Sequence, residues 1–149
     1  MSWEEARRWR QGFSGRLVFT NGVFDLIHPG HVDILSESRA RGDALVVGIN
    51  SDESVRRLKG PTRPIRGEAD RAYVVAGLEC VDLVVVFGDD TPLELIEALK
   101  PDVVAKGGDY SVETIVGAHE VRSWGGEAVV IPLTPGHSTT SIIEKLSGK

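Results

Sequence analysis

Two closely spaced histidines, His28 and His31, end the segment TNGVFDLIHPGH that covers residues 20–31. A proline and a glycine separate them, and one acidic residue, Asp25, precedes them within an apolar run. Imidazole side chains bind transition metals, exchange protons near neutral pH and donate hydrogen bonds to anions. The pair therefore suggests three interpretations: a metal site, a site for anion binding and catalysis, or an ordinary helix start.

A zinc site is the interpretation that the rest of the sequence supports least. A structural zinc ion takes four ligands, and cysteine and histidine are its usual donors. Beyond the pair, the chain offers only His119, His137 and Cys80, in no recognisable ligand pattern. We therefore expect no zinc centre.

The residues between the two histidines favour anion binding. Pro29 suits the first turn of a helix, and Gly30 allows a ligand to approach the backbone closely. A helix N-terminus attracts anions through its exposed N–H groups and its dipole. The sequence contains no G-x-x-x-x-G-K-[ST], G-x-G-x-x-G or G-x-S-x-G motif, so the P-loop, dinucleotide and hydrolase interpretations have no motif behind them. Two ordinary surface histidines remain the alternative.

A basic stretch, RRLKGPTRPIRGEADR, covers residues 56–71 of an otherwise acidic chain. It holds six basic residues and two acids, whereas the whole chain has a formal net charge of −5. A solvated loop and a clamp for an anionic ligand both fit this composition. A nucleotide with its phosphates is a ligand that needs such a clamp.

Short runs rich in Val, Ile and Leu alternate with helical patterns along the chain. The expected buried strands are 16–20, 44–50, 82–87, 102–106 and 127–132, and the expected helices are 29–42, 51–58, 68–78, 91–100 and 112–126. Near-continuous apolar strands are typical of a parallel sheet covered on both faces. The alternation predicts an α/β fold: a Rossmann-like, doubly wound sheet of about five parallel strands with helices on both faces.

Polar and glycine-rich residues follow several of these strands. Asn21 and Gly22 come after the first, NSDES after the second, KGGDY after the fourth and PLTPGHSTTSII at the end of the fifth. In open parallel sheets, ligands bind beyond the carboxyl ends of the strands. The sequence therefore predicts a ligand site at this edge.

The composition narrows the class of protein. A length of 149 residues with 41% hydrophobic and 26% charged residues fits one ordinary globular domain. No apolar run approaches the roughly 20 residues of a membrane span, and the charged N-terminus lacks a signal-peptide core. A single cysteine, Cys80, excludes an internal disulfide and favours the cytoplasm. The negative net charge argues against nucleic acid as a partner.

GVFDLIHPGH together with STTSII resembles the H-x-G-H nucleotidyltransferases of the cytidylyltransferase-like superfamily, over roughly residues 16–146. Within that superfamily, TNGVFDLIHPGH, NSDESVRRLKGPTRP, KGGDY and GHSTTSIIEK are most similar to the adenylyltransferase domain that makes ADP-heptose. The resemblance implies a stand-alone domain over 1–149, with an N-terminal helix in 1–14 and a catalytic core in 15–146.

The resemblance also implies a reaction. A sugar 1-phosphate, heptose 1-phosphate in the adenylyltransferases, attacks the α-phosphorus of ATP, and pyrophosphate leaves. Magnesium (Mg2+) is the implied cofactor, bound mainly through the nucleotide phosphates rather than by a protein site. The implied partners are ATP and the sugar phosphate, with no nucleic acid and no membrane, and we expect a homodimer.

Matching the family motifs residue by residue implies catalytic roles for His28, His31 and Lys59, which hold the phosphates. The implied nucleotide-binding residues are Thr20, Asn21, Gly22, Phe24, Gly30, Gly108, Asp109, Ser138, Thr139 and Thr140. The implied residues on the acceptor side are Asp25, near the reacting phosphates, and Arg71.

Two alternatives stay open at this point. A glycerol-3-phosphate cytidylyltransferase-like enzyme that uses CTP would share nearly every one of these roles, because the motif residues address phosphates. The preference for ATP rests on the resemblance alone. A non-catalytic nucleotide-binding module would keep the fold without turnover, but the presence of both histidines, Lys59 and the STT segment argues against it.

Overall fold

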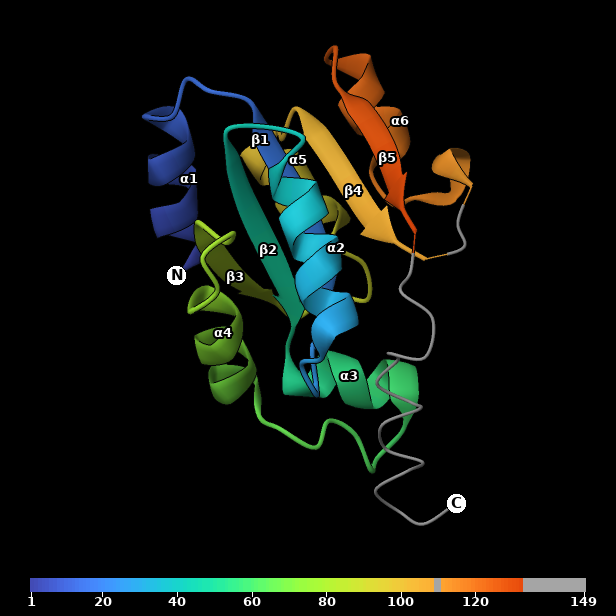
Figure 1. Ribbon diagram of the computed structural model, residues 1–149. Helices are drawn as coiled ribbons and strands as arrows, with labels where there is room; N and C mark the ends of the chain where they lie inside the picture. The colour runs from blue at the N-terminus through green and yellow to red at the C-terminus, as the bar shows by residue number, and fades with distance from the viewer. Residues whose placement is uncertain (109–110, 133–149) are drawn as a thin grey trace.

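The computed structural model describes residues 1–108 and 111–132 of the chain. Its centre is one five-stranded, all-parallel sheet with the strand order β3-β2-β1-β4-β5 (Figure 1). The strands are β1 (Leu17–Gly22), β2 (Ala44–Asn50), β3 (Leu83–Phe87), β4 (Val103–Gly107) and β5 (Glu127–Ile131). All five expected strands are confirmed to within two residues at each end.

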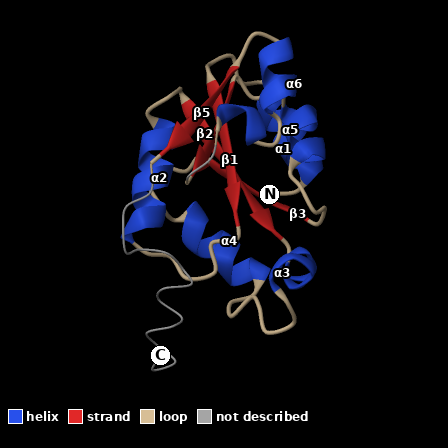
Figure 2. Cartoon of the chain, turned by 90° about the vertical axis from the view of Figure 1, so that its right-hand side faces the viewer, coloured by secondary structure: helices blue, strands red, loops and turns tan. Residues whose placement is uncertain are grey.

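Helices cover both faces of this sheet, as Figure 2 shows. They are α1 (Trp3–Gln11), α2 (Pro29–Arg39), α3 (Asp52–Lys59), α4 (Glu68–Ala76), α5 (Leu93–Leu99), the 3₁₀ turn η1 (Val112–Thr114) and α6 (Ala118–Ser123). Buried residues of α2 and α4 share one hydrophobic cluster, and those of α1, α5 and α6 share the other. The predicted doubly wound, Rossmann-like fold is therefore confirmed.

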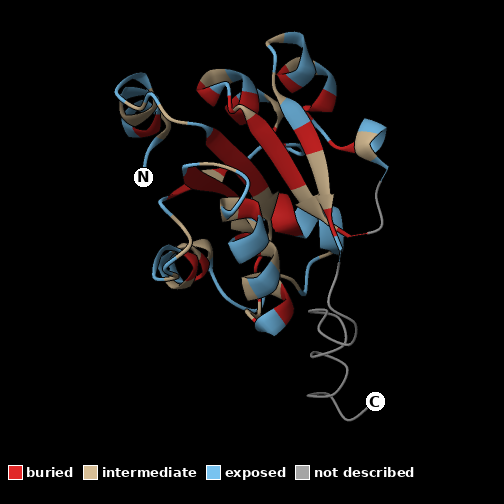
Figure 3. Cartoon of the chain, turned by 45° about the horizontal axis from the view of Figure 1, so that its top comes forward, coloured by how far each residue is buried: buried red, intermediate tan, exposed pale blue. Residues whose placement is uncertain are grey.

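Alternation along the central strands divides the core between the two faces. Phe19 and Val46 pack into the cluster under α1, α5 and α6, whereas Val18 and Val47 pack into the cluster under α2 and α4. Successive side chains of a strand point to opposite faces, so a strand buried on both sides must be apolar throughout. Figure 3 shows the result: the middle strands are buried along their length, and the helices expose their outer surfaces.

The expected continuous helix over 112–126 is wrong. The chain instead forms η1, then turns at Gly117, which has φ +88°, and begins α6 at the next residue. A Cβ at position 117 would lie 2.8 Å from Cδ1 of Ile96 on α5. The helical periodicity of the segment is interrupted because close packing against α5 needs a glycine in a left-handed conformation.

The expected N-terminal helix is confirmed as α1. Ser2 caps it, and Glu5 completes a capping box by accepting from the Ser2 backbone N–H. Arg10, in its last turn, donates hydrogen bonds to the carbonyl oxygens of Leu99 and Lys100 at the end of α5. Helix α1 is thus fastened to the end of α5. Among the described residues, no helix is long and apolar enough to cross a membrane.

Candidate active site

The site lies where β1 and β4 separate. These two central strands pair through Val18 with Val103 and Phe19 with Val104, and among the described residues the pairing goes no further. Beyond this point the carbonyl of Asn21 accepts a hydrogen bond from Nζ of Lys106, at 3.1 Å. Chain order reverses between β1 and β4, and this is the position at which open α/β sheets bind ligands.

The two histidines form one hydrogen-bonded unit at the start of α2. His28 is the N-cap, and its Nδ1 accepts from the backbone N–H of Gly30 at 3.1 Å. Nδ1 of His31 accepts from the backbone N–H of His28 at 3.3 Å. In their neutral forms both rings must therefore carry the proton on Nε2. The helix cap thus fixes the tautomer of each imidazole and makes each Nε2–H a hydrogen-bond donor.

The chain around Phe24 supports this unit from the side of β1. Phe24 adopts a left-handed backbone conformation, with φ 51°, and its ring meets the ring of His31 edge to face at a centroid distance of 5.2 Å. A Cβ at Gly22 would lie 2.8 Å from the Phe24 ring, so the glycine makes room for it. Non-glycine residues in this conformation are uncommon and concentrate at functional sites.

The pKa values of three basic groups at the site lie below their ordinary values, so their charged forms are destabilised in the absence of a ligand. Burial of the ring, together with repulsion from His28 and Lys59, lowers the pKa of His31 to about 4. Burial also lowers the pKa of Lys106, with repulsion from Lys59 as the second cause. Burial likewise lowers the pKa of Lys59, and repulsion from Arg63 adds to this effect. An anion placed among these groups would relieve the repulsion and accept their N–H donors.

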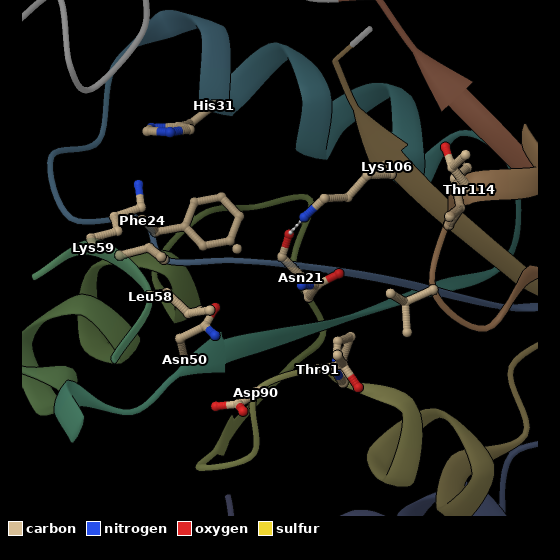
Figure 4. A pocket seen from close by; sticks show the side chains of 15 residues that line it. Asn21, Phe24, His31, Asn50, Leu58, Lys59, Asp90, Thr91, Lys106 and Thr114 are labelled. Atoms are coloured by element: carbon tan, nitrogen blue, oxygen red, sulfur yellow. Dashed lines mark hydrogen bonds between the residues drawn. The ribbon is translucent and has the colours of Figure 1, made fainter. Parts of the chain in front are cut away.

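Two adjoining cavities open at this point. The larger has a volume of about 440 Å³ and is lined by Asn21, Gly22, Val23, Phe24, His31, Asn50, Leu58, Lys59, Asp90, Thr91, Pro92, Lys106, Thr114, Ile115 and Val116 (Figure 4). The smaller, of about 170 Å³, is lined by Thr20, Asn21, Gly22, Val23, Phe24, His31, Ile34, Lys106 and Gly107. Both are bordered by residues 21–24, His31 and Lys106. Two ligands, one in each cavity, would meet at these shared residues.

Asp25 contacts the protein itself, whereas the family motif implies a place near the reacting phosphates. Its buried carboxylate accepts from the backbone N–H groups of Ile65, at 2.9 Å, and Arg66, at 2.8 Å, and pairs with Nε of Arg63 at 3.3 Å. Burial raises the pKa of Asp25, but these three donors outweigh it, and the pKa lies below its ordinary value. In this structure Asp25 holds the basic loop, residues 60–67, against the β1–α2 turn. The predicted contact of Asp25 with the acceptor stays a prediction.

Arg71 is also engaged by the protein itself. Its guanidinium is buried and donates to the carbonyl oxygens of Val23, Asn50 and Arg66 and to the carboxylate of Asp52. Among the described residues that line the two cavities, Arg71 is not included. The structure therefore shows a residue that ties four segments together under the site, and direct contact with the acceptor stays a prediction.

The other predicted residues divide into three groups. Thr20, Asn21, Gly22, Phe24, His31 and Lys59 line one or both cavities. His28 and Gly30 are buried in the first turn of α2 behind them, and Gly108 follows β4 with φ +131° and donates its N–H to Ile131. Asp109, Ser138, Thr139 and Thr140 lie outside the described residues.

Lys106 is a site residue that the sequence motifs do not indicate. The match to KGGDY implies roles only for Gly108 and Asp109. The available signal was a lysine at the carboxyl end of a strand that is otherwise apolar, because such a position is seldom charged without a partner. Its pairing with the carbonyl of Asn21, 85 residues away in the sequence, has no local signature.

A parallel sheet with phosphate-directed donors at its switch point defines a nucleotide-binding class of enzyme. The family described as cytidylyltransferase-like matches residues 19–145 of the chain. The chain therefore belongs to this family and is a nucleotidyltransferase, which confirms the resemblance drawn from the H-x-G-H segment.

Curated relatives share the whole of this domain. The bifunctional protein HldE of Acidiphilium cryptum is 58% identical over 143 residues, which are 96% of this chain and 29% of that protein. The protein of the same name from Paramagnetospirillum magneticum is 57% identical over 146 residues, 97% of this chain and 30% of that protein. The chain thus spans somewhat less than a third of the length of these relatives.

Solved structures support the fold. A lipopolysaccharide core biosynthesis protein from Thermoplasma volcanium superposes with a TM-score of 0.66 at 27% identity, over 81% of this chain and 98% of that one. A pantoate-beta-alanine ligase from Francisella tularensis gives a TM-score of 0.65 at 14% identity, over 98% of this chain and 75% of that one. The second likeness concerns the fold alone.

Proposed function

We propose that this chain transfers AMP from ATP to a sugar 1-phosphate, with heptose 1-phosphate as the natural acceptor, and releases pyrophosphate. The observation that carries the proposal is the group formed by His31, Lys59 and Lys106 at the separation of β1 and β4. These donors face a cavity large enough for a sugar phosphate. The identity to the HldE proteins supports the choice of acceptor.

The proposed step is a single displacement at phosphorus. A non-bridging oxygen of the sugar phosphate forms a bond to the α-phosphorus of ATP, and the bond from that phosphorus to the oxygen bridging to the β-phosphate breaks. The electron pair leaves with pyrophosphate. No side chain has to remove a proton, because a phosphate monoester has its second pKa near 6 and is largely dianionic at neutral pH.

The work of the protein is to bring two anions together and to stabilise charge in the transition state. His31 and Lys106 border both cavities, so their N–H groups can address phosphate groups from either side. Lys59 borders only the larger cavity, from the end of α3. With its pKa lowered to about 4, His31 is neutral at pH 7 in the absence of a ligand, so it contributes a hydrogen bond rather than a charge.

We propose that Mg2+ enters with the nucleotide. Among the described residues, no group of three or more His, Cys, Asp or Glu side chains could hold a metal ion, and the carboxylate of Asp25 is occupied by the basic loop. Magnesium bound to nucleotide phosphates neutralises part of their charge. The chain's own donors would then complete the coordination of the phosphates.

The choice of ATP over CTP rests on likeness to the adenylyltransferases, because the described donors address phosphates that every nucleotide shares. We expect a preference for ATP of at least about tenfold in kcat/KM, about 1.4 kcal/mol. Part of the expected nucleotide pocket, residues 133–149, lies outside the described residues. Homodimer formation likewise stays a prediction.

Pyrophosphate release, measured with ATP, CTP, UTP and GTP against a panel of sugar phosphates and glycerol 3-phosphate, tests the proposal. We expect the highest kcat/KM with ATP and heptose 1-phosphate. Equal or faster turnover of CTP would replace the proposal with a cytidylyltransferase. Nucleotide binding without pyrophosphate release for any pair would indicate a non-catalytic module.

A further inference from the structure

The larger cavity has two chemically different ends. His31, Lys59 and Lys106 lie at one end, and all three are nitrogen donors. Across the cavity lie Asp90 and Thr91, on the loop that follows β3, as Figure 4 shows. A carboxylate repels phosphate, so the Asp90 end is unsuited to the anionic part of a ligand. The cavity therefore fits a molecule with an anionic head and an uncharged polar tail.

Two threonine hydroxyls of the lining can recognise hydroxyl groups of a ligand. Thr91 lies beside Asp90, whereas Thr114 lies nearer to Lys106 in Figure 4. The hydroxyl of Thr114 donates to the carbonyl of Ser111 at 2.8 Å and keeps lone pairs that can accept. The hydroxyl of Thr91 accepts a long bond of 3.4 Å from the N–H of Leu93 and keeps its own proton to donate. Sugar hydroxyls both donate and accept, so they match this mixture of groups.

Asp90 is held in place from outside the cavity. Its Oδ1 accepts from Nε of Arg57, on α3, at 2.9 Å. A second Arg57 nitrogen donates to the carbonyl of Gly88 in the same loop. Arg57 itself does not belong to the described lining of the cavity. The arginine fixes one oxygen of the carboxylate and leaves the other able to accept a hydrogen bond.

Part of the lining is apolar. Leu58, Pro92, Ile115 and Val116 belong to it. Carbon-bound hydrogens of a sugar ring or a side chain of sugar carbons pack well on such a surface, whereas charged groups do not.

We propose that Asp90, Thr91 and Thr114 form the subsite that binds the hydroxyl groups of the acceptor, so that the sugar phosphate lies across the larger cavity with its phosphate at Lys106. This inference rests on the proposed function and adds the orientation of the acceptor and the residues that select it. It also places the nucleotide phosphates in the smaller cavity, beside α2.

The test compares Asp90→Asn with two matched variants. Asp89→Asn removes the neighbouring exposed carboxylate, which is not among the lining residues, and Arg57→Gln removes the ion pair but keeps the Asp90 carboxylate. We expect Asp90→Asn to raise KM for a sugar 1-phosphate about tenfold, with KM for ATP changed less than about twofold. Asp89→Asn should change KM for the sugar phosphate less than about threefold. Arg57→Gln loosens the Asp90 carboxylate without removing it, so it should raise this KM less than Asp90→Asn does.

Acceptor length supplies a second readout. Glycerol 3-phosphate has fewer hydroxyls to reach the far end, so Asp90→Asn should leave its kcat/KM within about twofold of the unsubstituted chain. Thr91→Val, which keeps the shape of the side chain and removes its hydroxyl, should raise KM for the sugar phosphate and not for glycerol 3-phosphate.

Failure of this inference differs from failure of the proposed function. If the unsubstituted chain binds a sugar 1-phosphate in a calorimeter without releasing pyrophosphate, the proposed function fails, and the same variants test the subsite through Kd. An equal KM or Kd for Asp90→Asn and the unsubstituted chain overturns the subsite. An equal rise for Asp89→Asn and Asp90→Asn also overturns it, since loss of a negative charge anywhere on this loop would then be sufficient. Absence of any sugar phosphate binding overturns it too.

Discussion

The imidazole rings of His28 and His31 lie face to face, with ring centroids 3.8 Å apart and planes inclined by 25°. Nδ1 of His31 accepts from the backbone N–H of His28, and Nδ1 of His28 accepts from Gly30. Each ring is thus held by a backbone group as well as by its neighbour. A substitution at either position changes both the helix start and the donors presented to phosphate.

Replacing either histidine should cost catalysis more than binding. We expect His31→Ala and His28→Ala each to lower kcat by at least about 100-fold, about 2.7 kcal/mol of transition-state stabilisation, with a smaller change in nucleotide affinity. His28→Asn separates the two roles of the N-cap, because asparagine also caps helices. It should keep thermal stability near that of the unsubstituted chain and still lose turnover. Near-normal kcat in either alanine variant would remove that histidine from the mechanism.

The lowered pKa of His31 predicts a specific loss of stability in acid. The unfolded histidine titrates near 6.5 and the folded one near 4, so above pH 6.5 both states are neutral and pH has no effect through this group. As the pH falls from 6.5 to 4, the unfolded state takes up a proton that the folded state refuses, and stability falls by up to about 1.4 kcal/mol per pH unit.

Urea unfolding at several pH values checks this prediction. The His31→Asn variant lacks the titrating ring, so its free energy of unfolding should depend less steeply on pH between 6.5 and 4 than that of the unsubstituted chain. Parallel curves for the two proteins over this range would show that His31 does not resist protonation in the folded state.

Lys106 should matter for turnover and little for folding. Lys106→Met keeps most of the side-chain length and removes a partly buried ammonium group, so thermal stability should be unchanged or slightly higher. We expect kcat/KM to fall by about 100-fold, because the group that borders both cavities loses its charge. The matched variant Lys100→Met replaces an exposed lysine outside the lining residues, and its kcat/KM should stay within about twofold. Equal activity of the two variants would contradict the assignment.

Asp25 should control the basic loop, residues 60–67. Asp25→Asn weakens the acceptor of the Ile65 and Arg66 N–H groups, so their amide hydrogens should exchange faster. Binding of an ATP analogue with sugar phosphate should slow exchange across the loop in the unsubstituted chain. Glu37→Gln, on the exposed face of α2, is the control and should exchange as the unsubstituted chain does. Exchange that is unaffected by Asp25→Asn would show that the loop is held by other contacts.

Arg71 should stabilise the whole site region. Arg71→Met leaves the carbonyl groups of Val23, Asn50 and Arg66 and the carboxylate of Asp52 without their donor. We expect a loss of about 3 kcal/mol in the free energy of unfolding by urea. Stability close to that of the unsubstituted chain, with KM for the acceptor greatly raised, would instead favour the direct substrate contact implied by the family motif.

Local patterns in the sequence were sufficient to predict the five strands and most of the helices. They were also sufficient to predict an anion site in the first turn of α2. The apolar runs fixed five buried strands because a strand covered on both faces has no polar position to offer. The H-x-G-H segment indicated an anion site because proline, glycine and histidine act there through neighbouring backbone groups. The broken helix at Gly117 was missed because its cause is Ile96, on another helix.

Only the tertiary structure decided what the long-range partners do. Lys106 reaches Asn21 across 85 residues, and Asp25 holds Ile65 across 40. The first pair forms because the strand order β3-β2-β1-β4-β5 places β4 beside β1. The second forms because the same order places β2 beside β1, so that the segments that follow these two strands meet. Sequence by itself thus determined which residue types stand at the carboxyl ends of the strands. The tertiary structure determined which of these residues share a cavity, because the chain crosses from one half of the sheet to the other between β3 and β4. Hydrogen bonds and charge repulsion act over short distances, and only the packing of the chain sets those distances.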